Sequence, residues 1–240
     1  IGMYDCIRGV ICGERSASSI THEWQKVDDI RDHMLYFLEN HDEQRIASDF
    51  FVGNPWKGVP GMIVSALLQQ NPVMVYAGQE FGERGMDKEG FSGQDGRSTI
   101  FDYWTSDTVY KGFFNRDALT TDEKKLSLIY QGLIRFCNRE KAVREGLAFD
   151  LMYVNQQSHQ FNPHKQFVFL RKADDEVLLV VANFDQERVQ INVTIPAHAF
   201  DFLGIPEQEV EMTDLLSGFT KVVDLKRDGQ VALDLSLIHI

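Results

Sequence analysis

The pattern that most constrains the fold is a strand–helix–strand succession in residues 34–80. Residues 34–38 and 73–77 are two short, continuous apolar runs, as expected of strands that are buried on both faces. Between them, apolar residues recur at the spacing of one helix face, at Val59, Met62, Ile63, Ala66 and Leu67. A crossover of this kind is right-handed and makes its two strands parallel.

Polar side chains follow both apolar runs at the point where each strand should end. Asn40, His41 and Asp42 come after the first run, and Gln79 and Glu80 come after the second. The carboxyl ends of parallel strands meet at one edge of a sheet, and in α/β barrels that edge carries the active site. The sequence therefore predicts a functional site where these two polar clusters meet.

The pattern changes after about residue 142. A helix is expected to begin at Thr120, which forms a capping box with Glu123. Beyond it, residues 166–171 and 177–184 are runs rich in strand-forming residues, and apolar and polar residues alternate over 189–195. Further short strands are expected near 208–213, 219–225 and 230–234. Short strands at regular spacing predict an antiparallel β-sandwich. The expected fold class is therefore α/β plus all-β, with an α/β part over residues 1–141 and a β-sandwich over 142–234.

Composition excludes several kinds of partner and site. The net charge is −12, from 36 acidic and 24 basic residues, which argues against nucleic acid as a partner. No apolar run is long enough to span a membrane. Cys6, Cys12 and Cys137 show no metal-ligand spacing, and His22, His33 and His41 show none either, so no metal site is predicted in this chain.

Three segments in order resemble the α-amylase family, glycoside hydrolase family 13. They are FLENHDEQRIAS at 37–48, PVMVYAGQEFG at 72–82 and DGRSTIFDYW at 95–104, the last of them typical of bacterial, Bacteroidetes-type members. The resemblance implies the C-terminal portion of a (β/α)8 TIM barrel in residues 1–141, followed by the C-terminal β-sandwich of that family. It extends in order over residues 1–234.

The resemblance also assigns roles to single residues. Asp42 matches the third catalytic acid, which stabilises the transition state through the hydroxyls of the sugar. His41 matches a neighbouring residue that binds substrate, and Arg45 fits the Asn-His-Asp-x-x-Arg pattern and is expected to line the substrate cleft. Glu80 is placed at the cleft floor by its strand-end position, and a structural hydrogen-bond role is an equal alternative. The alternative for Asp42 and His41 is that they only order the loop after the strand.

The same comparison identifies what this chain does not contain. The family's nucleophile Asp and acid/base Glu lie on earlier barrel strands, and a full barrel takes roughly 250 residues. The chain is therefore expected to be the C-terminal part of a longer enzyme and to be inactive alone. Residues 235–240 resemble a translated sequencing-library adapter and are set aside as a non-native tail.

These observations predict that the parent protein is a retaining α-glucan hydrolase that cleaves α-1,4-glucosidic bonds in starch or maltodextrin. A transglycosylase of the same family and a barrel homologue without activity, acting as a binding or structural subunit, remain alternatives. A third alternative is a separate carbohydrate-binding module in the sandwich. No cofactor is expected for this chain, calcium is possible in the parent, and a periplasmic or extracellular site is implied only by the resemblance. Asp95 and Arg97 are expected to form a loop ion pair or turn.

Overall fold

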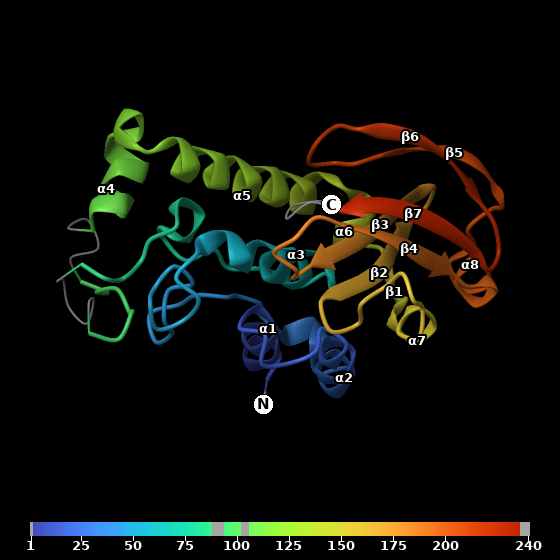
Figure 1. The fold of residues 1–240 in the computed structure, drawn as a ribbon, viewed down its shortest axis with the longest axis horizontal. Coiled ribbons are helices and arrows are strands. Elements are labelled where there is room, and N and C mark those ends of the chain that lie inside the picture. The colour runs from blue at the N-terminus through green and yellow to red at the C-terminus, as the bar shows by residue number, and fades with distance from the viewer. Residues whose placement is uncertain (1, 88–93, 102–105, 236–240) are drawn as a thin grey trace.

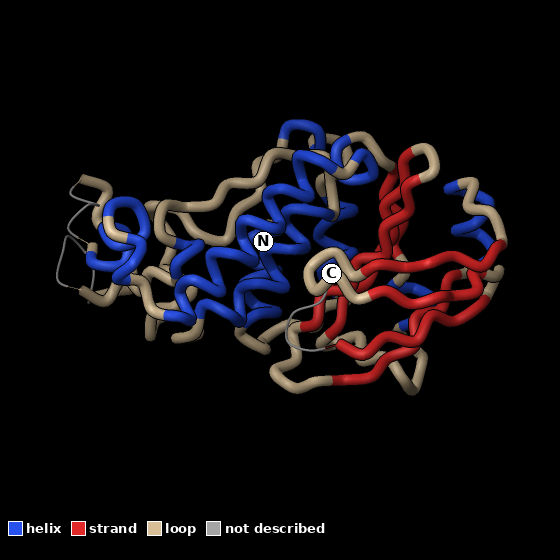
Figure 2. Tube along the Cα trace, turned by 90° about the horizontal axis from the view of Figure 1, so that it is seen from above, coloured by secondary structure: helices blue, strands red, loops and turns tan. Residues whose placement is uncertain are grey.

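The computed structural model describes residues 2–87, 94–101 and 106–235. Helices form one half of the molecule and strands the other, as Figures 1 and 2 show from two directions. The helical half holds α1 (Met3–Ile11), α2 (Ser19–Lys26), α3 (Val59–Leu67), α4 (Asp107–Phe114), α5 (Thr121–Arg139) and α6 (Lys141–Arg144). Short 3-10 turns join them at Arg31–His33, Pro55–Gly58, Gln79–Phe81 and Arg116–Ala118.

The helices predicted from periodicity are present. α3 covers the expected apolar stretch, and every one of its residues is buried. α5 begins after Thr120, whose side chain accepts from the Glu123 N–H while the Glu123 carboxylate accepts from the Thr120 N–H. This reciprocal capping box satisfies two of the N–H groups that a helix start leaves without partners.

The two barrel-type strand segments pair as predicted in direction, but not in extent. Tyr36 and Val73 form a single parallel bridge, with the Tyr36 N–H donating to the Pro72 carbonyl and the Met74 N–H to the Tyr36 carbonyl. Burial on both faces was expected, yet Leu35 is 48% exposed. Within the described residues no further strand pairs with either segment, and a strand is buried on both faces only where neighbouring elements cover both.

The β half contains antiparallel strands close to the predicted positions. They are β1 (Leu147–Asp150), β2 (Gln166–Ala173), β3 (Glu176–Asn183), β4 (Val189–Ile195), β5 (Gln208–Thr213), β6 (Thr220–Leu225) and β7 (Gly229–Leu235), with α7 (Met152–Asn155) and α8 (Ala197–Leu203) between them. β1, β2 and β3 form one sheet, β4 pairs with β7, and β5 pairs with β6. The described strands thus form three small sheets, where two facing sheets of a simple sandwich were expected.

A continuous apolar core joins the two halves. Its buried residues run from Met3 in α1 to Leu235 in β7, and α3 packs against β3. Polar contacts add to this junction, because the Ala17 and Ser18 N–H groups donate to the His164 and Pro163 carbonyls. The expected boundary between 141 and 142 falls inside α6, which itself packs against β2. This domain boundary stays a prediction, because the apolar core is built from residues of both halves.

Candidate functional site

The loop after the first strand segment presents His41 and Asp42 to solvent. Asn40 Oδ1 accepts from the backbone N–H groups of Asp42, at 2.8 Å, and of Glu43, at 3.0 Å, and so forms the turn. The side chains of His41 and Asp42 are 57% and 74% exposed, and His41 Nε2 lies 3.2 Å from Asp42 Oδ2. Asn40 therefore orders this loop, and the Asp42 carboxylate remains accessible to a ligand.

Arg45 lies deeper than the sequence analysis expected. Its side chain is only 3% exposed, and its guanidinium is 4.3 Å from the centre of the Tyr76 ring. It donates at 2.8 Å to Ser98 Oγ, to Glu39 Oε2 and to the Ala77 carbonyl. This buried charge holds three segments of the chain together, although its edge also lines a cavity described below.

A cavity of about 420 Å³ lies at the end of the two strand segments. It is lined by His41, Arg45, Tyr76, Ala77, Thr99 and Ile100. Its volume falls in the range of small-molecule sites, which are clefts of about 300–1,000 Å³. Residues from the loop after the first segment and from the end of the second thus meet at one cavity, as expected of the carboxyl ends of parallel strands.

Tyr76, Thr99 and Ile100 were not singled out from the sequence. All three lie inside the segments that carry the family resemblance, 72–82 and 95–104, and that is the one signal that pointed to them. Thr99 is buried and its Oγ1 accepts from the Phe101 N–H, whereas Ile100 is 53% exposed at the cavity. The exposed side chain of Ile100 gives this cavity an apolar wall that a sugar ring can contact.

The strand-end residues Gln79 and Glu80 make structural contacts. Gln79 Nε2 donates to the Tyr130 hydroxyl at 3.1 Å, and Glu80 Oε2 accepts from the Gly78 N–H at 3.1 Å. Burial raises the pKa of Glu80 above its ordinary value. Glu80 does not line the 420 Å³ cavity. Contact of Glu80 with substrate therefore stays a prediction. The hydrogen bond to Gly78 supports the alternative, in which Glu80 has a structural role.

The other polar and aromatic residues near the three resembling segments make structural contacts or lie outside the described residues. Asp95 and Arg97 form the expected loop ion pair, with Arg97 Nε 2.7 Å from Asp95 Oδ2, and the Arg97 guanidinium lowers the pKa of Asp95. Trp56 packs against the core, and its indole N–H donates to Asp122 Oδ2 at 2.8 Å. Tyr103 and Trp104, which belong to the third segment of the family resemblance, lie outside the described residues.

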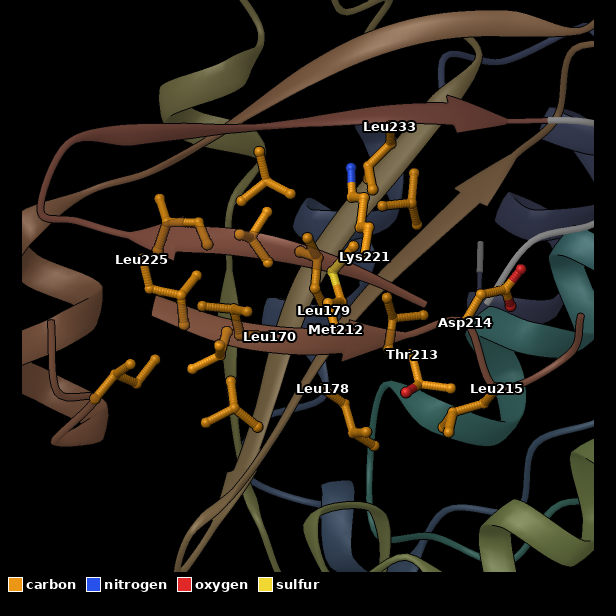
Figure 3. Close-up of a pocket in the computed structure, with 18 of the residues that line it drawn as sticks. Leu170, Leu178, Leu179, Met212, Thr213, Asp214, Leu215, Lys221, Leu225 and Leu233 are labelled. Atoms are coloured by element: carbon orange, nitrogen blue, oxygen red, sulfur yellow. The ribbon is translucent and has the colours of Figure 1, made fainter. Parts of the chain in front are cut away.

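A second and larger cavity lies between the sheets of the β half. Its volume is about 1240 Å³, and Figure 3 labels Leu170, Leu179, Met212 and Leu225 among the side chains that line it. Asp214 and Lys221 contribute polar groups near its margin, as the same figure shows. A sugar site needs convergent hydrogen-bonding groups that match ring hydroxyls. The lining also holds polar side chains, among them Glu176, Gln190 and Asn192, but it contains none of the residues that follow the two parallel strand segments.

Among the described side chains, no group of three or more His, Cys, Asp and Glu residues is placed to hold a metal ion. The three cysteines carry free thiols. No helix within the described ranges has both the length and the apolar character needed to cross a membrane.

The architecture is similar to part of several solved structures. One is a noncanonic maltogenic α-amylase, AmyB, from Thermotoga neapolitana, with 16% identity and a TM-score of 0.63 over 99% of this chain and 48% of that protein. Another is the α-amylase from Geobacillus thermoleovorans complexed with acarbose, with 15% identity and a TM-score of 0.64 over 99% and 45%. An isomaltulose synthase from Erwinia rhapontici, in complex with its natural substrate sucrose, gives 16% identity and a TM-score of 0.53 over 92% and 45%.

These similarities establish the fold of the chain. It spans about half the length of the solved structures that it matches. No protein-family model matches the sequence, and no curated protein matches it either. The α-amylase architecture is therefore shared at low identity, and the activity of the complete protein has to be argued from the site.

Proposed function

We propose that the protein to which this chain belongs is a retaining glycoside hydrolase that cleaves α-1,4-glucosidic bonds in starch or maltodextrin. The observation that carries this proposal is the placement of His41 and Asp42. Both are exposed on a loop ordered by Asn40, and His41 lines a cavity of ligand size at the end of the parallel segments. In an α-amylase architecture this is the end at which barrel enzymes place their catalytic groups.

The chemistry explains why an accessible carboxylate is needed there. Retaining glycosidases use a nucleophilic carboxylate and an acid/base carboxylate, about 5–5.5 Å apart, around an oxocarbenium-like transition state. Hydrogen bonds to the ring hydroxyls that strengthen in that state add several kcal/mol. A charged acceptor makes a stronger hydrogen bond than a neutral one. In this proposal Asp42 is that acceptor, His41 is a donor to a neighbouring hydroxyl, and the nucleophile and acid/base are supplied by the rest of the protein.

The proposed ligand is a neutral α-glucan oligosaccharide or polysaccharide. The solved neighbours include complexes with maltose and acarbose, which supports an oligosaccharide as the ligand class. The described residues offer no metal-binding group, so no step is assigned to calcium, and calcium in the complete protein stays a prediction. The Bacteroidetes-type origin and the extracytoplasmic site also remain predictions.

The proposal is tested by assaying the complete coding sequence on soluble starch and maltotriose, with Asp42→Asn beside the unchanged protein. We expect kcat to fall by about a thousandfold with an unchanged melting temperature, because an interaction made in the transition state is lost. Asp49→Asn is the matched control, since Asp49 is exposed in the same loop region and pairs with the exposed Arg84. This chain alone should release no sugar.

Two outcomes would contradict the proposal. A complete protein without activity on any α-glucan would favour the homologue that acts as a binding or structural subunit. A kcat for Asp42→Asn within threefold of the unchanged protein would remove the role assigned to Asp42.

A transglycosylase is the second candidate, favoured by the similarity to the isomaltulose synthase. Both reactions pass through the same glycosyl-enzyme intermediate and differ in the acceptor, which is water or a sugar hydroxyl. Product analysis with maltotriose separates them. Shorter sugars alone indicate hydrolysis, whereas products longer than the substrate or with new linkages indicate transfer.

A further inference from the structure

A buried ion pair brackets the loop that carries Asp42. Glu39 precedes the loop and Arg45 follows it, and Arg45 Nη1 donates to Glu39 Oε2 at 2.8 Å. The other carboxylate oxygen of Glu39 accepts from the Ile46 N–H at 2.7 Å. Both side chains are almost fully buried, at 2% and 3% exposure. The two ends of the loop are thereby tied to each other by one carboxylate.

The same pair also ties this loop to the other two segments that line the cavity. Arg45 Nη2 donates to the Ala77 carbonyl at the end of the second strand segment, and Nε donates to Ser98 Oγ, next to the cavity residue Thr99. The Arg45 N–H donates to the Gly96 carbonyl at 2.8 Å. All three segments around the cavity therefore meet at one guanidinium.

Local packing confirms how closely these segments approach. Gly85 has a φ of +58°, and a Cβ there would lie 2.6 Å from the Gly96 carbonyl oxygen and 3.0 Å from Arg45 Cγ. A side chain at this position would push the loop around Gly96 away from Arg45. A left-handed glycine at this point fits both the backbone conformation and the space.

The energetics indicate a role other than stability alone. Removing two charges from water is costly, and apolar replacement of a buried ion pair is often neutral or stabilising. What an apolar pair does not provide is direction. A planar guanidinium fixes the angles of its hydrogen bonds to a carboxylate, a hydroxyl and a carbonyl, and so fixes the relative placement of the segments that hold them.

We propose that Glu39 and Arg45 are positioning residues for the reaction, and that their buried pair sets the placement of the Asp42 loop relative to the cavity walls at Ala77 and Thr99. This inference rests on the proposed function and revises the role expected of Arg45. Neither side chain has to touch the sugar. A displacement of about 1 Å at a catalytic group is sufficient to reduce turnover by about a hundredfold.

The test separates position from stability with two variants in the complete protein. Glu39→Gln leaves the buried guanidinium without a counter-charge, and both kcat and melting temperature should fall. The double variant Glu39→Leu with Arg45→Met replaces the pair by apolar side chains. We expect its melting temperature to recover to that of the unchanged protein while kcat stays about a hundredfold lower and KM changes less than threefold.

A readout on the present chain accompanies the kinetics. Amide hydrogen exchange at Asp42 and Glu43, whose N–H groups bond to Asn40 Oδ1, should become at least tenfold faster in the double variant, because the loop is no longer tied at its ends. Lys124→Met, which removes an exposed charge from α5, is the control and should leave exchange, kcat and melting temperature unchanged.

The results distinguish this inference from the proposed function. If the unchanged complete protein does not act on α-glucans, the proposed function fails, and exchange at Asp42 still reports on loop placement. If the double variant regains full kcat together with its melting temperature, the pair is only stabilising and the positioning role is refuted. Should the double variant not fold, Glu39→Asp decides, because a full kcat with the shortened carboxylate also refutes it.

Discussion

Two cavities of this molecule differ in where they lie. The 420 Å³ cavity lies at the ends of the two parallel strand segments, and Arg45 at its edge is fixed by hydrogen bonds to Glu39, Ala77 and Ser98. The 1240 Å³ cavity lies between the sheets of the β half, and its lining combines aliphatic and polar side chains of the strands and their connections. Size alone would therefore identify the wrong site, whereas the position at the carboxyl ends of parallel strands identifies the smaller cavity.

The largest expected effect follows from separating the two halves. Residues 142–235 expressed alone should show no cooperative thermal unfolding by circular dichroism, because their core continues into α1, α3 and α5. They should also bind no maltotriose in calorimetry. A cooperative melt close to that of the whole chain would mean that the β half is a self-contained domain, and glucan binding by it would revive the carbohydrate-binding module.

A single arginine substitution also tests how strongly the two halves depend on each other. Arg171 in β2 is fully buried, and its guanidinium donates to carbonyls of both halves, at Leu67, Leu68, Ala142, Val143 and Gly146. Burial lowers its pKa to about 10. Arg171→Leu leaves buried carbonyls without donors and should lower the free energy of unfolding by about 3 kcal/mol.

The matched control is Arg188→Leu. Arg188 is also in the β half, but its pair with Asp234 is exposed to solvent, so the change should lower the free energy of unfolding far less than Arg171→Leu. Chemical denaturation of both variants compares the two positions directly. Equal losses at both would show that burial of Arg171 does not join the halves.

The same leucine-to-alanine substitution should lower the free energy of unfolding by different amounts in the closed core and at the large cavity. Leu151 is fully buried in the closed core, and Leu151→Ala should lower the free energy of unfolding by about 2–5 kcal/mol. Leu179 is half-buried and lines the large cavity, so Leu179→Ala removes fewer contacts and should cost about 1 kcal/mol. A loss at Leu179 as large as at Leu151 would indicate that the cavity is closed in solution.

The smallest expected effect concerns pH. Burial raises the pKa of Asp150, whose carboxylate accepts from the Thr21 hydroxyl and the Met152 N–H, both at 2.6 Å. A carboxyl with a raised folded-state pKa favours the folded state below its unfolded pKa, and this contribution is lost as the pH rises through the folded pKa. Asp150→Asn should therefore raise the melting temperature by a few degrees at pH 7, and the gain should shrink as the pH falls through the raised pKa and vanish below about 4.

Asp174→Asn provides a control of opposite sign. Lys141 lowers the pKa of the exposed Asp174, so its contribution is present above the unfolded pKa and is lost as the pH falls. This variant should be slightly less stable at pH 7 and no different in acid. Melting curves of both variants between pH 3 and pH 7 check the two directions.

Local features were predictable because their causes lie within a few residues. The capping box of Thr120 and Glu123 spans three positions, and the strands at 189–195 and 208–213 follow from alternation along the chain. The ion pair of Asp95 and Arg97 likewise depends on neighbours. The burial of Arg45 was not predicted, since it depends on Glu39, Ala77 and Ser98 together, and its contact with substrate stays a prediction.

The sequence by itself determined the order of the α/β and β halves, the parallel direction of the two strand segments and the exposed loop of His41 and Asp42. Each follows from periodicity or from a short motif, which are properties of consecutive residues. Only the tertiary structure decided that Arg45 is buried between three segments of the chain and that Tyr76, Thr99 and Ile100 line the 420 Å³ cavity. The same holds for Arg171, which joins the two halves. These depend on which distant backbone groups approach one side chain, and no local pattern encodes that approach.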